Sequence, residues 1–590
     1  MDVGESSFYP LLLGILERIS RAHFVTFDLE LSGVPVKTHA QRGTAGNPTL
    51  QERYDELRAA ADRFTILQVG ITVVEQDRIN DKYMVFPYNF NLSPLVQEWG
   101  VEVEREISFS SSAAEFLLKA GFNFDLPFRS GVPYLSRDED RKAWERALER
   151  LNRAKVEDIQ LDGSQEELLK FVERVRNEIK EWLKIIAPRQ TNIDPFDRLQ
   201  QELLSDLPRL VPTKSSRKSR SPHQAKIELL ITGTPDPHDS TNPSRNPSNH
   251  STGIDEPPSP PRVVSLTNLQ KRLVHQLVRA EFPELISFSC PSAIRVKLLD
   301  REREAREQER SRRRAREAIN RATGFRWLVE ALIVGGNIRG IDVVGECAKD
   351  PQTGATLMVF ENQIFERFRS LQFALSRRRP PLVGHNLFFD LAYLYRTFVG
   401  VLPEKVGAFA EKVGELWPTV LDTKYMATHG VSEARTDSSL EQMEAALRMQ
   451  SRPVTELAPG HEKYVCATNV PLLTPLDRAS FAHEAGYDAY LTALVMIRLS
   501  AKLKAASVAT TTPSNKQTDV DNNNGEAARY AFASRGDITP GSLMPQFNDT
   551  EFWSEYANKL RVYGSVEGLL EIPAGGGEAD GGVSLETQHW

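Results

Sequence analysis

Cysteine is scarce in this chain of 590 residues. The three cysteines, Cys290, Cys347 and Cys466, lie far apart and form no CxxC pair, so neither a disulfide framework nor a structural zinc site is expected. Long apolar runs are also missing. The longest run near the start, Tyr9 to Ile15, is shorter than the roughly 18 residues that a membrane helix needs. We therefore expect a soluble intracellular protein that makes no membrane contact.

A large excess of charge of one sign is absent as well. The formal net charge is −7 and the isoelectric point is near 6.0, which argues against a chain coated in basic surface but allows a local basic groove. The residues present are 40% hydrophobic and 8% aromatic, which suffices for a sizeable core and excludes a wholly disordered chain. A chain of this length predicts about two or three folded units joined by linkers.

Changes in composition divide the chain into segments. Residues 1–150 and 321–503 alternate helical and strand patterns, as globular parts do. Between them, 151–186 and 262–320 have the patterns of a smaller domain, whereas 187–261 is rich in Pro, Ser, Thr and Asn. That stretch cannot bury enough apolar surface to offset the entropy lost on ordering, so we predict that most of it is a disordered loop.

The remaining segments are linkers, tails and charged runs. Residues 504–540 read as a linker, 541–573 as a compact aromatic patch with strand character, and 574–590 as a flexible tail. Arg301–Glu317 is dense in charge and is either a solvated helix or a basic ridge that contacts nucleic acid. The basic cluster Lys214–Arg220 is either a nuclear import signal or part of a solvated linker.

Local patterns indicate an α/β fold, because strand and helix signals alternate. The clearest strand patterns cover His23–Leu31, Phe64–Val74 and Lys82–Pro87. The clearest helical patterns in the second globular part cover 362–378, 388–398 and 487–503.

Asp28 and Glu30 lie two positions apart in the apolar segment Phe24–Gly33. In a strand, positions i and i+2 share a face, so the two carboxylates project side by side. They repel each other and lose hydration unless a cation lies between them, and their oxygens suit Mg²⁺ or Mn²⁺. The alternative is an edge strand with a solvated face.

Two later segments carry further candidates. Asp390 falls in the first turn of a helix that follows the short apolar strand 381–383, where the helix dipole favours a carboxylate. His483 precedes Asp488 near the start of the helix predicted over 487–503, so a loop imidazole and a first-turn carboxylate can converge. Taken singly, each of these residues also has an ordinary structural explanation.

The chain carries a D-x-E motif, then a single Asp, and then an H-x4-D motif. This order matches the histidine-containing branch of the DEDD exonuclease superfamily. The surrounding residues of 1–135 and 324–503 resemble the poly(A)-specific ribonuclease branch of that superfamily, with weaker likeness over 265–320. The motifs that carry this resemblance are Gly121–Asp125, Gly131–Tyr134, Leu421–Ala427 and His483–Asp488. The resemblance implies a ribonuclease-H-like α/β nuclease fold with a mixed sheet, interrupted by a small inserted α/β domain of nucleic-acid-binding type.

The activity implied by the resemblance is 3′-to-5′ exoribonuclease activity that shortens poly(A) tails and releases 5′-AMP. Asp28, Glu30, Asp390 and Asp488 would hold two Mg²⁺ ions, with Mn²⁺ as a substitute. His483 would act as the general base, a role that suits an imidazole near neutral pH.

The resemblance extends to substrate and partners. Lys424 would meet a substrate phosphate, and Leu31 and Val34 would pack near the terminal nucleotides of a single-stranded RNA 3′ end. A homodimer in the nucleus or the cytoplasm is also implied. Two alternatives stay open: a 3′-trimming exoribonuclease for small noncoding RNA without strict poly(A) preference, and a catalytically silent RNA-binding scaffold.

Two features depart from that family's pattern. The inserted domain is named for an Arg-x3-His motif, but this chain has Lys271-x3-His275, so RNA contact and a structural insertion are both open. After residue 503 no aromatic sequence of the ribonucleoprotein type is found. We therefore expect Phe552, Trp553 and Tyr563 to pack on the nuclease core rather than to form an RNA-recognition domain.

Overall fold

The computed structural model describes most of the chain in segments. These are residues 1–35, 47–152, 158–162, 164–186, 228–233, 264–338, 341, 344–358, 361–429, 439–464, 483–511, 541 and 543–574. The basic cluster Lys214–Arg220 and the tail beyond 574 lie outside the described residues, as does most of 187–261 and of 504–540. The chain divides into two compact units: Met1–Leu148 together with Arg313–Trp590, and Glu149–Arg312.

The first unit is built on a mixed sheet. Its strands follow the order β1-β4-β3-β2-β9-β10, with β5 and β11 also paired to β4. The bounds are β1 (Asp2–Val3), β2 (Phe24–Leu31), β3 (Ile66–Asp77), β4 (Lys82–Ser93), β5 (Val132–Pro133), β9 (Leu382–Gly384), β10 (Val420–Asp422) and β11 (Val454–Leu457). β2, β3 and β4 are antiparallel neighbours, whereas β9 and β10 extend the sheet in parallel with β2. The predicted mixed α/β architecture is confirmed.

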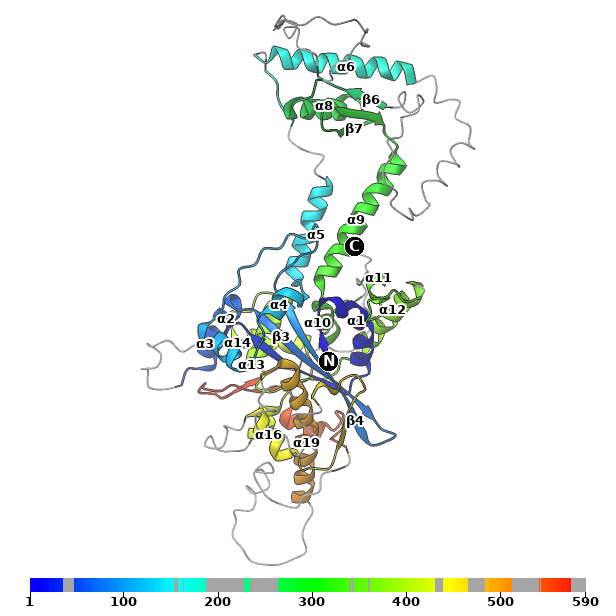
Figure 1. The fold of residues 1–590 in the computed structure, drawn as a ribbon. Coiled ribbons are helices and arrows are strands. Elements are labelled where there is room, and N and C mark those ends of the chain that lie inside the picture. The colour runs from blue at the N-terminus through cyan, green and yellow to red at the C-terminus, as the bar shows by residue number, and fades with distance from the viewer. Residues whose placement is uncertain are drawn as a thin grey trace, which may run out of the picture. The chain divides into compact units, whose positions relative to one another are not determined.

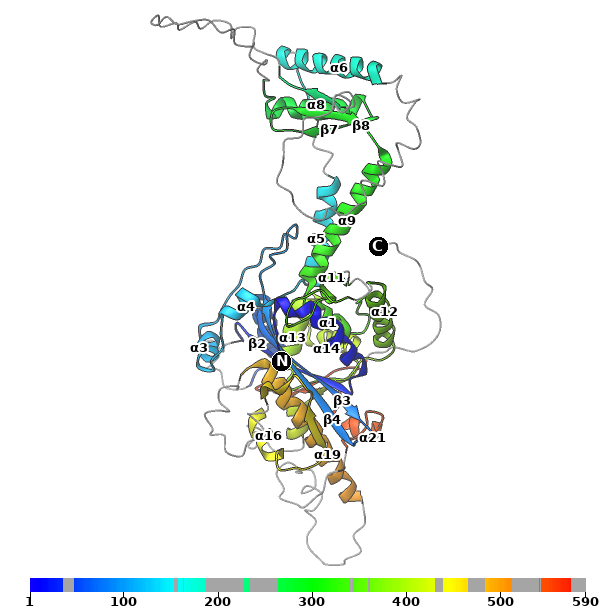
Figure 2. The ribbon, with the colours of Figure 1, turned by 45° about the vertical axis from the view of Figure 1, so that its right-hand side comes forward.

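Helices cover both faces of this sheet. The helices of the first unit are α1 (Glu5–Arg21), α2 (Leu50–Arg63), α3 (Ser111–Lys119), α4 (Asp125–Ser130), α10 (Arg326–Leu332), α11 (Val344–Cys347), α12 (Glu361–Arg377), α13 (Phe388–Leu394), α14 (Val406–Leu416), α15 (Thr423–Thr428), α16 (Leu440–Leu447), α19 (Ala485–Thr511) and α21 (Thr550–Tyr556). Buried residues of α1, α12 and α14 share one core, and those of α16, α19 and α21 share another. Figure 1 shows α1 and α19 on opposite sides of the strands, and the turned view in Figure 2 keeps that separation.

β2 is buried along nearly its whole length, although Thr26, Asp28 and Glu30 alternate with apolar residues along it. β3 and β9 flank it, so the alternative of an edge strand with a solvated face is wrong. Two other local predictions also need correction. The helix predicted over 388–398 ends at Leu394 and continues as a π-helical turn, Tyr395–Val399. The helix predicted over 487–503 runs to Thr511, so the predicted linker begins later than residue 504.

The C-terminal patch is a helix and a hairpin. Phe552 and Trp553 lie in α21 rather than in a strand. The pattern of aromatic residues does not distinguish the two, but the Asp549 side chain caps the helix by accepting a hydrogen bond from Phe552 N. The hairpin strands β12 (Lys559–Arg561) and β13 (Leu569–Glu571) follow. Apolar residues of this patch belong to both cores of the first unit.

The second unit has its own core. Two helices, α6 (Glu166–Ile186) and α8 (Asn268–Glu281), pack with an antiparallel sheet in the order β6-β8-β7. The strands are β6 (Glu228–Ile231), β7 (Leu285–Ser289) and β8 (Ile294–Leu298). β6 lies inside the stretch 187–261 that was predicted to be disordered. The prediction is wrong for these residues, because Ile231 is buried against β8. The helices α5 (Arg137–Asn152) and α9 (Arg301–Thr323) cross the unit boundaries in sequence.

Candidate active site

The candidate site begins on β2, the interior strand of the sheet. Alternate residues of this strand face opposite sides. Phe27 lies in the core that contains α1, whereas the Thr26 hydroxyl donates a hydrogen bond of 2.6 Å to the carbonyl oxygen of Ala489 in α19. Asp28 and Glu30 continue the Thr26 side of the strand, so both carboxylates face α19. Glu30 is only 8% exposed.

Close packing of α19 against β3 places Asp488 beside these carboxylates. Gly70 is the β3 partner of Asp28, and a Cβ atom at Gly70 would lie 1.8 Å from the carbonyl oxygen of Ala485. Only a residue without a side chain lets the first turn of α19 approach so closely. Asp488 lies in that turn and therefore reaches the face of the sheet that carries Asp28.

Two amide side chains hold the first turn of α19 on the sheet. Gln68 Oε1 accepts a hydrogen bond of 2.9 Å from Ala485 N. Asn89 Oδ1, on β4, accepts one of 3.1 Å from Gly486 N. These N–H groups belong to the helix start, where no carbonyl of the same helix is available. Gln68 and Asn89 therefore act as remote caps and fix the segment that carries His483.

His483 lies beside two of the carboxylates. Single ligand atoms of Glu30, His483 and Asp488 lie within 4.8 Å of one another. The backbone of His483 is left-handed, with φ of 63°, and its ring makes an edge contact with the ring of Phe116 on α3, with 4.5 Å between centroids. Sequence reasoning missed Phe116, because nothing in a short amphipathic helix marks one aromatic residue as the neighbour of a distant histidine.

The fourth carboxylate comes from the junction of β9 and α13. Asn386 has a φ of 63°, which turns the chain so that Asp390 falls in the first turn of α13. Asn386 N donates a hydrogen bond of 2.8 Å to Asp422 Oδ1 at the end of β10. The turn between β9 and α13 is thereby tied to the neighbouring strand.

Asp422 is a structural residue that sequence reasoning did not single out. It is fully buried and also accepts hydrogen bonds from Lys424 N at 2.9 Å and from Arg561 N at 3.0 Å. Burial raises its pKa to about 6, although these backbone N–H groups favour the ionised form. One carboxylate thus joins β10, α13, α15 and the C-terminal hairpin. The motif Leu421–Ala427 was the available signal, but spacing alone does not reveal this junction.

The electrostatics of the cluster are those of buried like charges. Burial, followed by the charge of Asp390, raises the pKa of Asp28 well above its usual value. Burial raises the pKa of Glu30 most, and the charges of Asp28, Asp488 and Asp390 add to it. Burial with the charge of Asp422 raises the pKa of Asp390, and burial with the charge of Asp28 raises that of Asp488. Because these carboxylates raise one another's pKa values, the four carboxylates of the sequence prediction lie in one cluster.

The donor set suits a hard divalent cation. In the described part of the chain, no lysine or arginine is among the main causes of the pKa shifts of the four carboxylates. Buried carboxylates that lack a compensating charge destabilise a fold, and carboxylate oxygens are the ligands that Mg²⁺ and Mn²⁺ prefer. The residues therefore fit a metal site.

The three residues predicted to contact substrate lie in different environments. Leu31 is buried in the core with α1, and Val34 is 37% exposed. Lys424 is buried in α15 with its Nζ atom 5.3 Å from the ring centroid of Tyr563. Tyr563 is half-buried, and the Arg561 guanidinium lies 5.6 Å from the same ring centroid. The C-terminal hairpin therefore adds an aromatic ring and a cation next to Lys424.

In the second unit, the motif residues have internal partners. Lys271 Nζ donates hydrogen bonds to the carbonyl oxygens of Cys290 at 2.8 Å and Pro291 at 2.7 Å. The His275 ring nitrogens lie 2.7 Å from the Ser287 hydroxyl and 2.8 Å from the Ser289 hydroxyl. These contacts hold α8 on β7 and the turn after it. No helix in the described part of the chain is long and apolar enough to cross a membrane.

Comparison with known proteins gives relatives for most of this chain. Poly(A)-specific ribonuclease PARN of Xenopus laevis is 22% identical over 509 residues, which cover 85% of this chain and 62% of that protein. An uncharacterized protein of Schizosaccharomyces pombe is 23% identical over 516 residues, 86% of this chain and 95% of that protein. Pre-piRNA 3′-exonuclease trimmer of Bombyx mori is 22% identical over 509 residues, 85% of this chain and 71% of that protein.

A family model supplies the last observation. The model of the CAF1 family ribonucleases matches residues 3–496. This range contains β2, the junction of β9 and α13, and the start of α19, which carry the acidic cluster and His483. The chain belongs to the CAF1 family of ribonucleases.

Proposed function

We propose that this protein is a metal-dependent 3′-to-5′ exoribonuclease that shortens poly(A) tails and releases 5′-AMP. The observation that carries the proposal is the cluster of the buried Glu30 and the half-buried Asp28, Asp390 and Asp488, with a ligand atom of His483 within 4.8 Å of those of Glu30 and Asp488. The similarity to poly(A)-specific ribonucleases of vertebrates supports the poly(A) preference. The strand order β4-β3-β2-β9-β10 supports a ribonuclease-H-like fold.

The four carboxylates would hold two Mg²⁺ ions, with Mn²⁺ as a substitute. Such ions supply the charge that activates a water molecule and stabilises the leaving 3′ oxygen. The protein holds the four carboxylates in position. β2 fixes two of the carboxylates by pairing on both edges, and the first turns of α13 and α19 fix the other two.

His483 would take the proton from the attacking water. A neutral imidazole accepts a proton at one ring nitrogen, and His483 combines an exposed position with contact distance to the cluster. The remote caps Gln68 and Asn89 hold the helix start that follows His483. The edge contact with Phe116 restricts where the ring can lie. We infer that these three neighbours orient the base.

Substrate contacts are proposed for the three residues of the sequence prediction. Lys424 would meet a phosphate of the RNA, and Leu31 and Val34 would lie near the terminal nucleotides. Tyr563 extends this surface, because its ring lies beside Lys424, and an aromatic ring next to cations suits a stacked base with its phosphate. Adenine preference itself does not follow from these residues and rests on the relatives.

The deciding experiment is a product assay on two 3′-hydroxyl RNAs of equal length that end in oligo(A) or oligo(U). Mg²⁺-dependent release of 5′-AMP from the oligo(A) RNA alone is expected, and EDTA should abolish it. Equal trimming of both RNAs would reject poly(A) specificity. No metal-dependent product from either RNA would reject the enzyme and favour an RNA-binding scaffold.

A second candidate function is 3′ trimming of small noncoding RNA. The similarity to the Bombyx mori protein named as a pre-piRNA trimmer favours it, and the same catalytic residues would serve. The inserted unit would contribute RNA binding in either case only through surfaces other than Lys271 and His275. A homodimer in the nucleus or cytoplasm is part of the proposal through the family resemblance alone.

A further inference from the structure

A second polar cavity of the first unit lies at the start of β2, away from the acidic cluster. Its volume is about 520 Å³, and its walls include His23, Gln76, Arg78, Arg378 and Phe547. The strand rises ~3.3 Å per residue, so five residues separate His23 from Asp28 by roughly 16 Å along β2. A cavity of this volume falls within the usual range for small-molecule sites.

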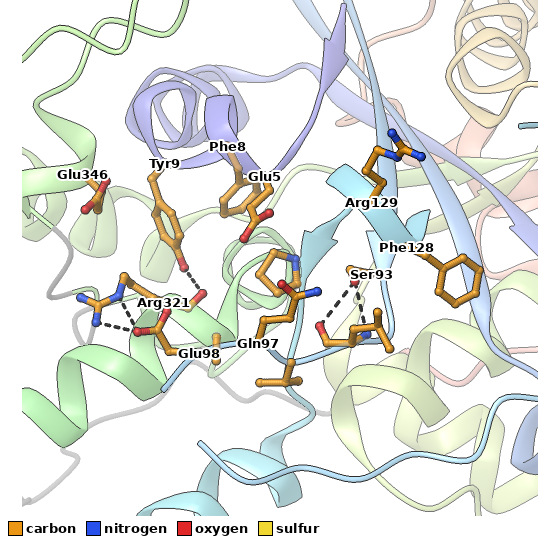
Figure 3. Close-up of a pocket in the computed structure, with 15 residues that line it drawn as sticks. Glu5, Phe8, Tyr9, Ser93, Gln97, Glu98, Phe128, Arg129, Arg321 and Glu346 are labelled. Atoms are coloured by element: carbon orange, nitrogen blue, oxygen red, sulfur yellow. Dashed lines mark hydrogen bonds and ion pairs between the residues drawn. The ribbon is translucent and has the colours of Figure 1, made fainter. Parts of the chain in front are cut away.

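The charges around this cavity are of one sign. No aspartate or glutamate is among the residues that line it. The cavity beside α1 in Figure 3 differs, because both acidic residues (Glu5, Glu98 and Glu346) and basic ones (Arg129 and Arg321) line it, and Arg321 pairs with Glu98 at 2.7 Å. The Figure 3 cavity therefore carries charges of both signs. The cavity at His23 is cationic. We call it the arginine cavity.

Most N–H donors of the two guanidinium groups in the arginine cavity have no hydrogen-bond acceptor among the described residues. Arg78 Nη2 donates to Gln546 Oε1 at 3.2 Å, and Arg378 Nη2 donates to the carbonyl oxygen of Ala22 at 3.3 Å. A guanidinium has five N–H donors. Within the described residues neither group forms an ion pair with a carboxylate. Glu75, next to Gln76 on β3, instead pairs with Arg18 at 3.7 Å.

Buried polar atoms in the wall lack partners. His23 is 7% exposed, and its Nε2 atom accepts and donates no hydrogen bond among the described residues. Both amide atoms of Gln76 are likewise without a partner. Unsatisfied buried polar atoms are rare and require an explanation, such as a bound ligand. Burial lowers the pKa of His23 to about 4, and the charges of Arg378 and Arg78 lower it further. Both guanidinium groups therefore lie close enough to His23 to affect its protonation.

An aromatic ring completes the cavity. Phe547 is half-buried, with its ring centroid 4.9 Å from that of His23 and 5.0 Å from that of Trp553. The Trp553 ring stacks on Phe547 and holds it in place. Cations that keep free donors, next to an anchored flat ring, are the groups that recognise a phosphate joined to a base.

We propose that the arginine cavity is a nucleotide site distinct from the catalytic centre, in which Arg78 and Arg378 bind a phosphate group and Phe547 contacts the base. The phosphate belongs either to a free 5′-mononucleotide or to a segment of RNA. The site does not depend on hydrolysis, so its existence and the proposed exonuclease activity fail or succeed separately.

The test is equilibrium dialysis of radiolabelled 5′-AMP against the full chain in EDTA. Without metal, the four carboxylates of the catalytic cluster repel phosphate, and the binding that depends on Arg78 and Arg378 reports on the arginine cavity. One saturable site is expected, with competition by inorganic phosphate and weak binding of adenosine. The double variant Arg78→Ala/Arg378→Ala should weaken binding at least about tenfold, or about 1.4 kcal/mol.

A matched control is Arg369→Ala, which should leave AMP binding unchanged. It removes an exposed arginine of α12 whose one ion pair among the described residues is with Glu366. A parallel titration uses a short oligo(A) RNA in EDTA. Loss of AMP binding in the double variant assigns the site to free nucleotides, and loss of RNA binding alone assigns it to the RNA chain. If neither ligand distinguishes the double variant from Arg369→Ala, the proposal is wrong. Thermal unfolding of each variant checks that the fold is intact.

Discussion

The two units use polar side chains in opposite ways. In the second unit, Lys271 and His275 match a motif associated with nucleic-acid binding, yet their polar atoms hold α8 on β7. In the first unit, Asp28 and its three neighbours lie buried or half-buried in one cluster, and their pKa values are raised. A motif residue with satisfied hydrogen bonds stabilises the fold. Clustered carboxylates that lack a counter-charge indicate a cation-binding site.

The largest effect that would test this comparison comes from Asp28. Asp28→Asn should reduce hydrolysis on the order of 10⁴-fold, the scale on which loss of one member of a catalytic set acts. In EDTA the same change should raise the melting temperature, because it removes one of the repelling charges. Single-turnover kinetics and thermal unfolding would measure the two effects. A variant with normal activity, or one that is less stable in EDTA, would contradict our view of the cluster.

Acid should destabilise the first unit through a buried histidine. Burial lowers the pKa of His461 to about 4, below the ordinary value, so the unfolded chain binds a proton before the folded unit does. The contribution of His461 to stability is therefore lost as the pH falls from about 7 to about 4, by up to about 3 kcal/mol. The raised pKa values of the acidic cluster act in the opposite direction. Hydrogen exchange of β4, whose Pro87 carbonyl contacts His461, would follow this loss. His461→Gln should flatten the pH dependence, and an unchanged slope would exclude His461 as its source.

The remote caps should affect catalysis more than binding. Gln68→Ala removes the acceptor of Ala485 N and should lower kcat about 10- to 100-fold, as for other supporting residues of a metal site. KM should change little, because Gln68 supports the segment of His483. Gln68→Glu keeps an acceptor oxygen at this position and should retain more activity than Gln68→Ala. A rise in KM alone would contradict a positioning role.

The smallest effects are expected in the second unit. Lys271→Met and His275→Phe should each destabilise that unit by about 1 kcal/mol, the usual net value of hydrogen bonds of this kind. Hydrolysis of a short oligo(A) RNA should stay within twofold of wild type, on the order of experimental scatter. Arg272→Ala, at a neighbouring position on α8, serves as the control for charge. Strongly weakened RNA binding in Lys271→Met with unchanged stability would reverse our interpretation.

Much of the site could be predicted from sequence because its residues lie in local patterns. Period-two alternation placed Asp28 and Glu30 on one face, and helix-start signals placed Asp390 and Asp488 in first turns. Long-range contacts could not be predicted in this way. Gly70, Gln68 and Phe116 act through backbone approach or contact with residues hundreds of positions away, which no local pattern encodes. β6 was missed because four strand residues cannot outweigh the polar composition around them.

The hairpin after α21 bears on the order in which the chain acquires function during synthesis. Asn558 exchanges backbone and side-chain hydrogen bonds with Val420 on β10, and Arg561 N reaches Asp422. A chain emerging from the ribosome can pair β2 with β3 early, since few residues separate them. Asp422 gains its last partner only after residue 561 has left the exit tunnel. The nascent chain therefore carries an incompletely supported candidate active site until nearly the whole described sequence has been translated. This would delay the proposed cleavage of RNA near the translating ribosome.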